Sequence, residues 1–162
     1  IGSQLKEKEM QSKVLIPLDG SESAELAVEE ALELSSAWKS VHLILVDSSP
    51  YQARQLEGYT IYADQYAEIR KQSGMAYLQP FKERLEAVGL EVSTSVVFGD
   101  PVQVIVKSAH KNNSELLIIG ESGSSWFERH AGLSKYAPRL SRQLEAAVIT
   151  VQGNKKKVKA AA

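Results

Sequence analysis

Glycine and serine residues cluster between positions 120 and 134, where Gly120, Ser122, Gly123 and Ser134 stand in one stretch. A glycine has no Cβ, so its backbone N–H can approach a phosphate oxygen closely, and a serine hydroxyl can add a further hydrogen bond. A connection of about a dozen residues is long for a compact domain, which favours a functional role. The stretch is a candidate anion-binding loop, although the same glycines also fit an ordinary connection.

A second candidate is Asp19, which follows the short apolar run of residues 13–18 and precedes Gly20 and Ser21. A carboxylate at the end of a buried strand can accept a hydrogen bond from a ligand hydroxyl or amine. The same residues also fit a turn followed by a helix N-cap at Ser21. The two interpretations are compatible.

Enzymatic chemistry is the least supported class. The chain has no cysteine, which excludes disulfides, thiolate nucleophiles and cysteine zinc sites. His42, His110 and His130 have no partners at metal-ligand spacing, so no metal site is expected. The sequence lacks a spaced nucleophile, base and orienting residue, a Gly-x-x-x-x-Gly-Lys loop, and a Gly-x-Gly-x-x-Gly after the first strand.

Composition predicts one ordinary globular domain. The 162 residues are 43% hydrophobic and 24% charged, with a formal net charge of −1, so no overall field favours nucleic acid or an anionic membrane. No apolar run is long enough to span a bilayer, and the polar stretch from Gln4 to Ser12 does not resemble a signal peptide. With no cysteine, a cytoplasmic location is expected.

Short apolar runs alternate with helical patterns along the chain. Helices are predicted after Ser21, over residues 69–88, from Pro101 behind an Asp100 cap, and around Leu140 and Leu144. Gly74 and Pro80 lie inside the second of these, which predicts a kink or break. The predicted strands are residues 13–18, 41–46, 91–98, 116–119 and 147–151.

This order of elements predicts an α/β fold with a doubly wound parallel sheet and helices on both faces. Ligands bind such sheets at the carboxyl ends of the strands. Residues 1–12 are interpreted as an N-terminal extension, residues 13–152 as the folded domain, and residues 153–162 as a lysine-rich C-terminal tail. Residues 148–151 (Val148 to Val151) are predicted to form an edge strand, which favours pairing with a second copy.

Three motifs within residues 13–152 together resemble the universal stress protein family. They are Val14–Ser21 (VLIPLDGS), Gly99-Asp100-Pro101, and Ile118–Gly123 (IIGESG). The resemblance implies a five-stranded sheet in the order 3-2-1-4-5 and a homodimer formed through the last strand. It also implies a regulatory role in stress responses, and the family has members that bind ATP and members that do not.

In the nucleotide-binding members, Gly-x-x-Gly is followed after nine residues by Gly-Ser or Gly-Thr. Here Leu133 stands where the third glycine is expected, Gly132 comes one place early, and Ser134 keeps the hydroxyl. Lys135 is a candidate to replace the lost contact with its charge. Pro138 is expected to move the helix start from Ser134 to near Ala137, because its ring would crowd the carbonyl of Ser134.

The resemblance places Pro17, Leu18 and Asp19 near an adenine and ribose, with Leu45 near the base. The phosphates would contact Gly120, Ser122, Gly123, Ser134 and Lys135. ATP or a related adenine nucleotide is therefore the expected ligand of a regulatory module.

Two other functions stay open. The loop could instead bind a regulatory protein through Trp126, Phe127 and Tyr136, in an interaction module or a cytosolic domain of a larger protein such as a transporter. A slow nucleotide hydrolase using Asp19 and Lys135 is the third possibility.

Overall fold

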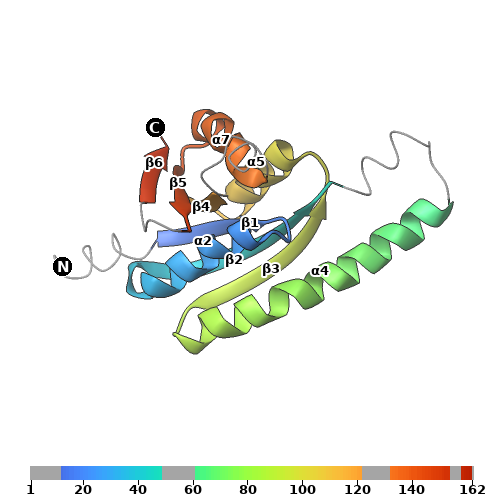
Figure 1. Cartoon of the computed structure of the whole chain (residues 1–162), viewed down its shortest axis with the longest axis horizontal. Coiled ribbons are helices and arrows are strands. Elements are labelled where there is room, and N and C mark those ends of the chain that lie inside the picture. Colours follow the sequence, from blue (N-terminus) through green and yellow to red (C-terminus); the bar gives the residue numbers. More distant parts are fainter. Residues whose placement is uncertain (1–11, 49–60, 122–131, 154–157, 162) are drawn as a thin grey trace.

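The structure is a computed structural model that describes residues 12–48, 61–121, 132–153 and 158–161. Its elements in chain order are β1 (Ser12–Leu18), α2 (Glu22–Glu33), the 3-10 turn η1 (Ser35–Ala37), β2 (Trp38–Asp47), α4 (Ile61–Ala87), β3 (Glu91–Phe98), α5 (Pro101–Lys111), β4 (Leu116–Glu121), the 3-10 turn η2 (Leu133–Tyr136), α7 (Ala137–Gln143), β5 (Ala147–Gln152) and β6 (Val158–Ala161). Figure 1 shows the strands in one twisted sheet.

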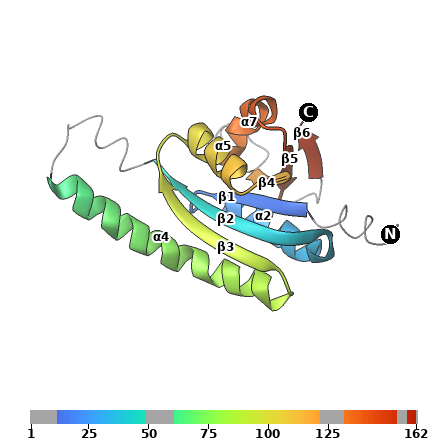
Figure 2. The ribbon, with the colours of Figure 1, turned by 180° about the vertical axis from the view of Figure 1, so that it is seen from behind.

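The predicted fold is confirmed. Strands β1 to β5 are parallel and lie in the order β3-β2-β1-β4-β5. Helices α2 and α4 cover one face, and α5 and α7 cover the other, as Figures 1 and 2 show from opposite sides. The carboxyl ends of β1, β2 and β4 therefore meet at one edge of the sheet, where the ligand is expected.

The predicted edge position of Val148–Val151 is wrong. β6 pairs antiparallel with β5, with Val148 opposite Ala161 and Val151 opposite Val158, so β5 is an inner strand. Sequence patterning missed β6 because it follows three lysines and is too short to show a periodic apolar pattern. Within the described residues, β6 and β3 form the two outer strands of the sheet.

Both faces of the central strands are buried, which explains why they read as continuous apolar runs. In β1, Val14, Ile16 and Leu18 face α2 and α4. Leu15 lies between them in the chain and faces α5 and α7. All four side chains are no more than 1% exposed, so the sheet is the centre of two hydrophobic cores.

Two helix starts follow the predicted capping chemistry. The hydroxyl of Ser21 accepts a hydrogen bond of 3.3 Å from the backbone N–H of Ala24 at the start of α2. At the start of α5, the Oδ2 atom of Asp100 accepts a 3.1 Å hydrogen bond from the N–H of Gln103, and Pro101 is the first helical residue. These caps fix how the chain leaves β1 and β3.

Helix α4 is unbroken from Ile61 to Ala87, so Gly74 and Pro80 do not break it. Pro80 and Ala76, whose carbonyl loses its helical partner, are both exposed, so water can satisfy that carbonyl. Leu78, Phe81 and Leu85 on the buried side hold the helix on the sheet. Although α4 has 27 residues, no helix in the described ranges is long and apolar enough to cross a membrane.

Three large apolar side chains in or next to these helices are exposed: Leu34 (45%), Ile69 (62%) and Val88 (48%). Leu34 and Val88 lie just beyond the ends of α2 and α4. Ile69 belongs to the early turns of α4, which project beyond the sheet in Figure 1. Helical spacing predicts which residues share a face, but not how far the neighbouring sheet extends.

Candidate functional site

The apolar part of the candidate site is the row Leu18–Leu45–Val96, formed by neighbouring residues of β1, β2 and β3 near their carboxyl ends. Leu18 and Leu45 belong to the core on the α2 and α4 side, and they are 0% and 9% exposed. Pro17 precedes Leu18 and pairs with Ile44, whose side chain belongs to the opposite core. The two leucines thus lie together, whereas Pro17 belongs to the other face.

Asp19 forms the turn between β1 and α2. Its Oδ1 atom accepts a 3.0 Å hydrogen bond from the backbone N–H of Ser21 and a second bond from the Ser21 hydroxyl. Among the described residues, the Oδ2 atom makes no hydrogen bond. The Oδ1 oxygen of Asp19 therefore builds the turn between β1 and α2.

Gly132 brings the far end of the glycine-rich stretch to this turn. A Cβ atom on Gly132 would lie 3.5 Å from Oδ2 of Asp19 and 4.0 Å from the hydroxyl oxygen of Ser23. The φ angle of Gly132 is +75°, which only glycine adopts readily. Residues more than 100 positions apart in the sequence therefore meet at the carboxyl edge of the sheet.

Ser134 lies two residues further on and is 9% exposed. Its hydroxyl oxygen is buried and has no hydrogen-bond partner among the residues that the structure describes. Buried hydroxyl groups are nearly always paired in folded proteins, so an unpaired one marks a place where a ligand can supply the missing bond.

Lys135 and the start of α7 follow the buried Ser134 in the chain. Lys135 is exposed, and its ammonium group lies 5.0 Å from the ring centre of Tyr136. Residues Leu133–Tyr136 form a 3-10 turn, and α7 begins at Ala137, which confirms the start predicted from Pro138. A phosphate at Ser134 would thus lie before α7 and would depend on nearby side chains.

Close packing against α2 requires a glycine at position 120, which the sequence did not reveal. It is buried in β4, and a Cβ atom there would lie 1.7 Å from the carbonyl oxygen of Ser23 in α2. The N-terminus of α2 therefore rests directly on the backbone of β4. This contact alone explains the glycine, so its part in phosphate binding stays a prediction.

The remaining predicted loop residues, Ser122 and Gly123, lie outside the described residues, as do Trp126, Phe127 and Arg129.

An ion pair at the same edge was missed by sequence reasoning. Nε of Arg70 in α4 donates a 2.7 Å hydrogen bond to Oδ2 of Asp47, the last residue of β2. The Asp47 side chain is 8% exposed and the Arg70 side chain 45% exposed. The hydrogen bond and the charge of Asp47 raise the pKa of Arg70. The pair attaches the outer part of α4 to the sheet.

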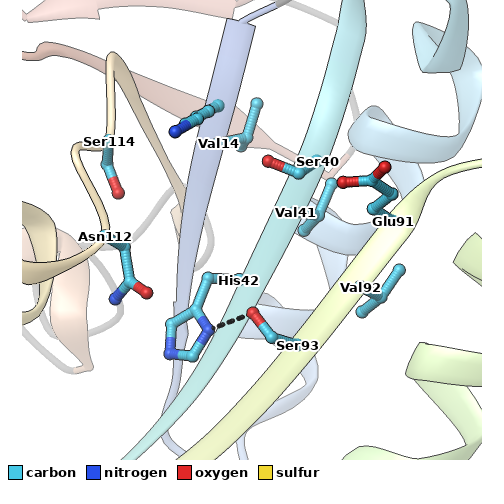
Figure 3. Close-up of a pocket in the computed structure, with 10 residues that line it drawn as sticks. Val14, Ser40, Val41, His42, Glu91, Val92, Ser93, Asn112 and Ser114 are labelled. Carbon is cyan, nitrogen blue, oxygen red and sulfur yellow. Dashed lines mark hydrogen bonds between the residues drawn. The ribbon is translucent and has the colours of Figure 1, made fainter.

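A separate cavity of about 310 Å³ lies at the opposite, amino ends of the strands. Figure 3 shows His42 of β2 at its wall, and Ser40, Glu91 and Asn112 also line it. Nδ1 of His42 lies 2.6 Å from the Ser93 hydroxyl oxygen, and Nε2 lies 2.9 Å from that of Ser95. The imidazole thus bridges two serines of β3.

Burial and the positive charge of Lys111 lower the pKa of His42 below its ordinary value of 6.5. His42 therefore binds a proton less readily in the folded protein than in the unfolded chain. We expect the free energy of unfolding to fall as the pH drops below about 6.5. His42→Gln should lessen this loss, by up to about 1.4 kcal/mol per pH unit. Urea unfolding between pH 5 and pH 8 measures the difference.

His110→Gln is the control for this prediction, because His110 is exposed on α5. A stability profile that is the same in wild type and His42→Gln would contradict it.

In the described ranges, no group of three or more histidine, aspartate or glutamate side chains is placed to hold a metal ion. The carboxyl edge thus offers a carboxylate oxygen, the buried hydroxyl of Ser134 and an apolar row. Such a set suits an organic ligand with polar substituents.

Comparison with known proteins identifies the family. The model of the universal stress protein family matches residues 10–152. A universal stress protein of Methanocaldococcus jannaschii is 29% identical over 146 residues, which cover 89% of this chain and 84% of the relative. A putative universal stress protein of Staphylococcus aureus is 32% identical over 120 residues, which cover 72% of this chain and 69% of the relative.

Solved structures share the fold. A universal stress protein in complex with cAMP superposes with a TM-score of 0.60 at 22% identity, covering 88% of this chain and 98% of that one. A family protein from Arabidopsis thaliana with AMP bound also has a TM-score of 0.60, at 19% identity, covering 90% of this chain and 94% of that one. On its sequence motifs, its fold and these matches, the chain belongs to the universal stress protein family.

Proposed function

We propose that this protein is a cytoplasmic regulatory module of stress responses that binds ATP or a related adenine nucleotide. Residues 13–152 form the binding domain in this proposal, and the ligand lies at the carboxyl ends of β1, β2 and β4. Solved family structures with cAMP and with AMP support the class of ligand.

One observation carries the proposal. Asp19 at the end of β1 lies next to Gly132 at the far end of the glycine-rich stretch. Its Oδ2 atom is 3.5 Å from the position that a Cβ atom on Gly132 would occupy. Two residues further on, Ser134 holds a buried hydroxyl that has no partner within the described part of the chain. An unpaired buried hydroxyl destabilises the empty protein by about 1–3 kcal/mol, and a ligand that bonds to it removes that penalty.

The available groups match different parts of a nucleotide. The Oδ2 oxygen of Asp19 only accepts hydrogen bonds when ionised, so it suits a ribose hydroxyl or the base amine. The Ser134 hydroxyl and the Lys135 ammonium group suit phosphate oxygens. Leu18 and Leu45 offer apolar surface to the base.

The start of α7 makes phosphate binding here depend on side chains. Because α7 begins only at Ala137, its first N–H groups lie after Ser134 in the chain. Lys135 is exposed and can leave the Tyr136 ring to meet a phosphate. The charge of Lys135 would then replace the backbone contact of the motif's third glycine, whose position Leu133 occupies here.

The experiment compares wild type with Asp19→Asn. Saturating ATP should raise the melting temperature of the wild type, because a ligand that binds only the folded state stabilises it. Asp19→Asn can keep the bond to the Ser21 N–H but removes the charge, so we expect affinity for ATP to fall about tenfold or more. Titration calorimetry measures both dissociation constants.

Asp100→Asn is the matched control, because Asp100 also accepts a backbone hydrogen bond at a helix start but lies after β3. It should bind ATP as the wild type does. A wild-type protein whose melting temperature is unchanged by ATP, AMP and cAMP alike would overturn the proposal.

The homodimer remains part of the proposal. A second copy that pairs with Val148–Val151 would need the backbone groups that β6 now occupies, so this dimer requires β6 to move away. The mass in solution of the same samples, compared with the 17.8 kDa chain, tests it.

A further inference from the structure

The cavity of about 310 Å³ at the amino ends of the strands lies at the opposite end of the sheet from Asp19. Its walls come from the first residues of β1, β2 and β3 and from the connection between α5 and β4. Figure 3 shows Asn112 and Ser114 of that connection on one side and Ser40 and Glu91 on the other. Ligand pockets have volumes upward of about 300 Å³, so this cavity suits a small molecule.

The side chains that face the cavity are polar. Val14 and Val41 belong to the core on the α2 and α4 side, and Val92 packs against that core. Side chains alternate between the two faces of a sheet, so the residues next to these valines point to the opposite face. The strand residues that line the cavity on that face are Lys13, Ser40, His42, Glu91 and Ser93. A cavity with these walls favours a polar ligand over an apolar one.

Two opposite charges lie on one row of the sheet. Ser40 of β2 pairs with Lys13 of β1 on one side and with Glu91 of β3 on the other. Neighbouring strands are about 4.8 Å apart, so the Cα atoms of Lys13 and Glu91 are separated by about 10 Å. Within the described part of the chain, neither side chain forms an ion pair. The cavity therefore offers a cation and an anion on either side of a hydroxyl.

The rest of the wall is fixed and uncharged. Both ring nitrogens of His42 bond to hydroxyls of β3, at 2.6 Å to Ser93 and 2.9 Å to Ser95. The lowered pKa of His42 keeps the ring neutral near pH 7. Across the cavity, Nδ2 of Asn112 donates a 2.8 Å hydrogen bond to the carbonyl oxygen of Ser108. These groups are held in place before any ligand arrives, which lowers the entropy cost of binding.

We propose that this cavity binds a small zwitterion of the amino acid class, with Lys13 at its carboxylate and Glu91 at its ammonium group. A carboxylate only accepts hydrogen bonds and an ammonium group only donates them, so each meets its complement. An inorganic anion would be repelled by Glu91, and a simple amine by Lys13. Glu91 is exposed, which leaves the cavity open to an entering ligand. This site does not depend on the proposed nucleotide function.

The test titrates the full chain with L-alanine, propionate and ethylamine and follows its backbone amide signals by NMR. Propionate lacks the ammonium group of alanine, and ethylamine lacks its carboxylate. We expect alanine to shift the signals of Ser40, His42 and Ser114. Propionate and ethylamine should each bind roughly tenfold more weakly or worse, because each leaves one charged side chain without its partner. Titrations with the other standard amino acids show which side chain fits best.

Two variants test the assigned roles. Lys13→Met keeps most of the stem and removes the charge, and Glu91→Gln keeps the shape of the carboxylate. Each should bind alanine roughly tenfold more weakly. Lys13→Met should also lose the preference for alanine over ethylamine, and Glu91→Gln the preference over propionate. A general loss of folding would not remove one preference and keep the other.

Lys107→Met and Glu33→Gln are the matched controls, because both residues are exposed and neither lines the cavity. They should bind alanine as the wild type does. The melting temperatures of all four ligand-free variants should stay close to that of the wild type, since exposed charges contribute little to stability.

The inference would be overturned if no standard amino acid bound, if propionate or ethylamine bound as tightly as alanine, or if the shifted signals lay at the carboxyl edge. Lys13→Met and Glu91→Gln variants that bind like their controls would overturn it as well. A separate titration with ATP tests the proposed function. Failure of ATP to bind leaves the amino acid site standing, and the reverse also holds.

Discussion

Replacing Gly120 with alanine is expected to lower the free energy of unfolding by about 3 kcal/mol or more. The new Cβ atom would lie 1.7 Å from the carbonyl oxygen of Ser23, 2.6 Å from its carbonyl carbon and 3.0 Å from Cα of Ala24. All three are backbone atoms, so no side-chain rotation can relieve the clash. The start of α2 has to move away from β4, which also displaces the turn that holds Asp19. Urea denaturation of both proteins measures the loss.

Gly153→Ala is the matched control for this substitution. A Cβ atom there would meet only the Leu26 side chain, at 3.2 Å, and the end of a flexible side chain can shift. We expect a change of less than about 1 kcal/mol. If Gly120→Ala were as stable as Gly153→Ala, the close approach of α2 and β4 would be refuted.

Replacing Arg70 with alanine is expected to cost about 2 kcal/mol, the second largest loss. Its partner Asp47 is 8% exposed, so the carboxylate would lose its bond to Arg70 in surroundings with little water. The outer part of α4 would also lose its attachment to β2. The midpoint of urea unfolding should therefore fall.

The pair between Arg84 and Glu29 gives a closely matched comparison. Its nitrogen–oxygen distance is 2.6 Å, against 2.7 Å for Arg70 and Asp47, and the two arginines are 47% and 45% exposed. Glu29, however, is 54% exposed. Exposed ion pairs contribute about 0–1 kcal/mol, so Arg84→Ala should cost little. Equal losses in the two variants would show that burial of Asp47 does not matter.

Most of the fold could be predicted from the sequence because its signals are local. Continuous apolar runs indicated strands covered on both faces, and Ser21 and Asp100 marked helix starts that the structure confirms. Pro138 likewise indicated a helix start near Ala137. Each of these depends on residues within one or two turns of the chain.

The errors arose where distant contacts outweigh local preference. Pro80 did not break α4, because Leu78, Phe81 and Leu85 anchor the helix to the sheet around it. Val148–Val151 are not an edge strand, because β6 adds to them from the C-terminal residues. Neither effect is encoded in the pattern of a single element.

For the site, sequence motifs indicated Asp19, Ser134 and the carboxyl edge of the sheet. The sequence could not show that Gly120 is needed by the backbone of α2, or that Gly132 lies beside Asp19. Both follow from crossover connections that bring remote segments within contact distance. The order and type of the elements from β1 to β5 could thus be predicted from the sequence alone, through local backbone preferences and apolar patterning. Which polar groups meet at the sheet edge, and which remain without a partner, was decided only by tertiary packing, because those distances depend on the whole chain.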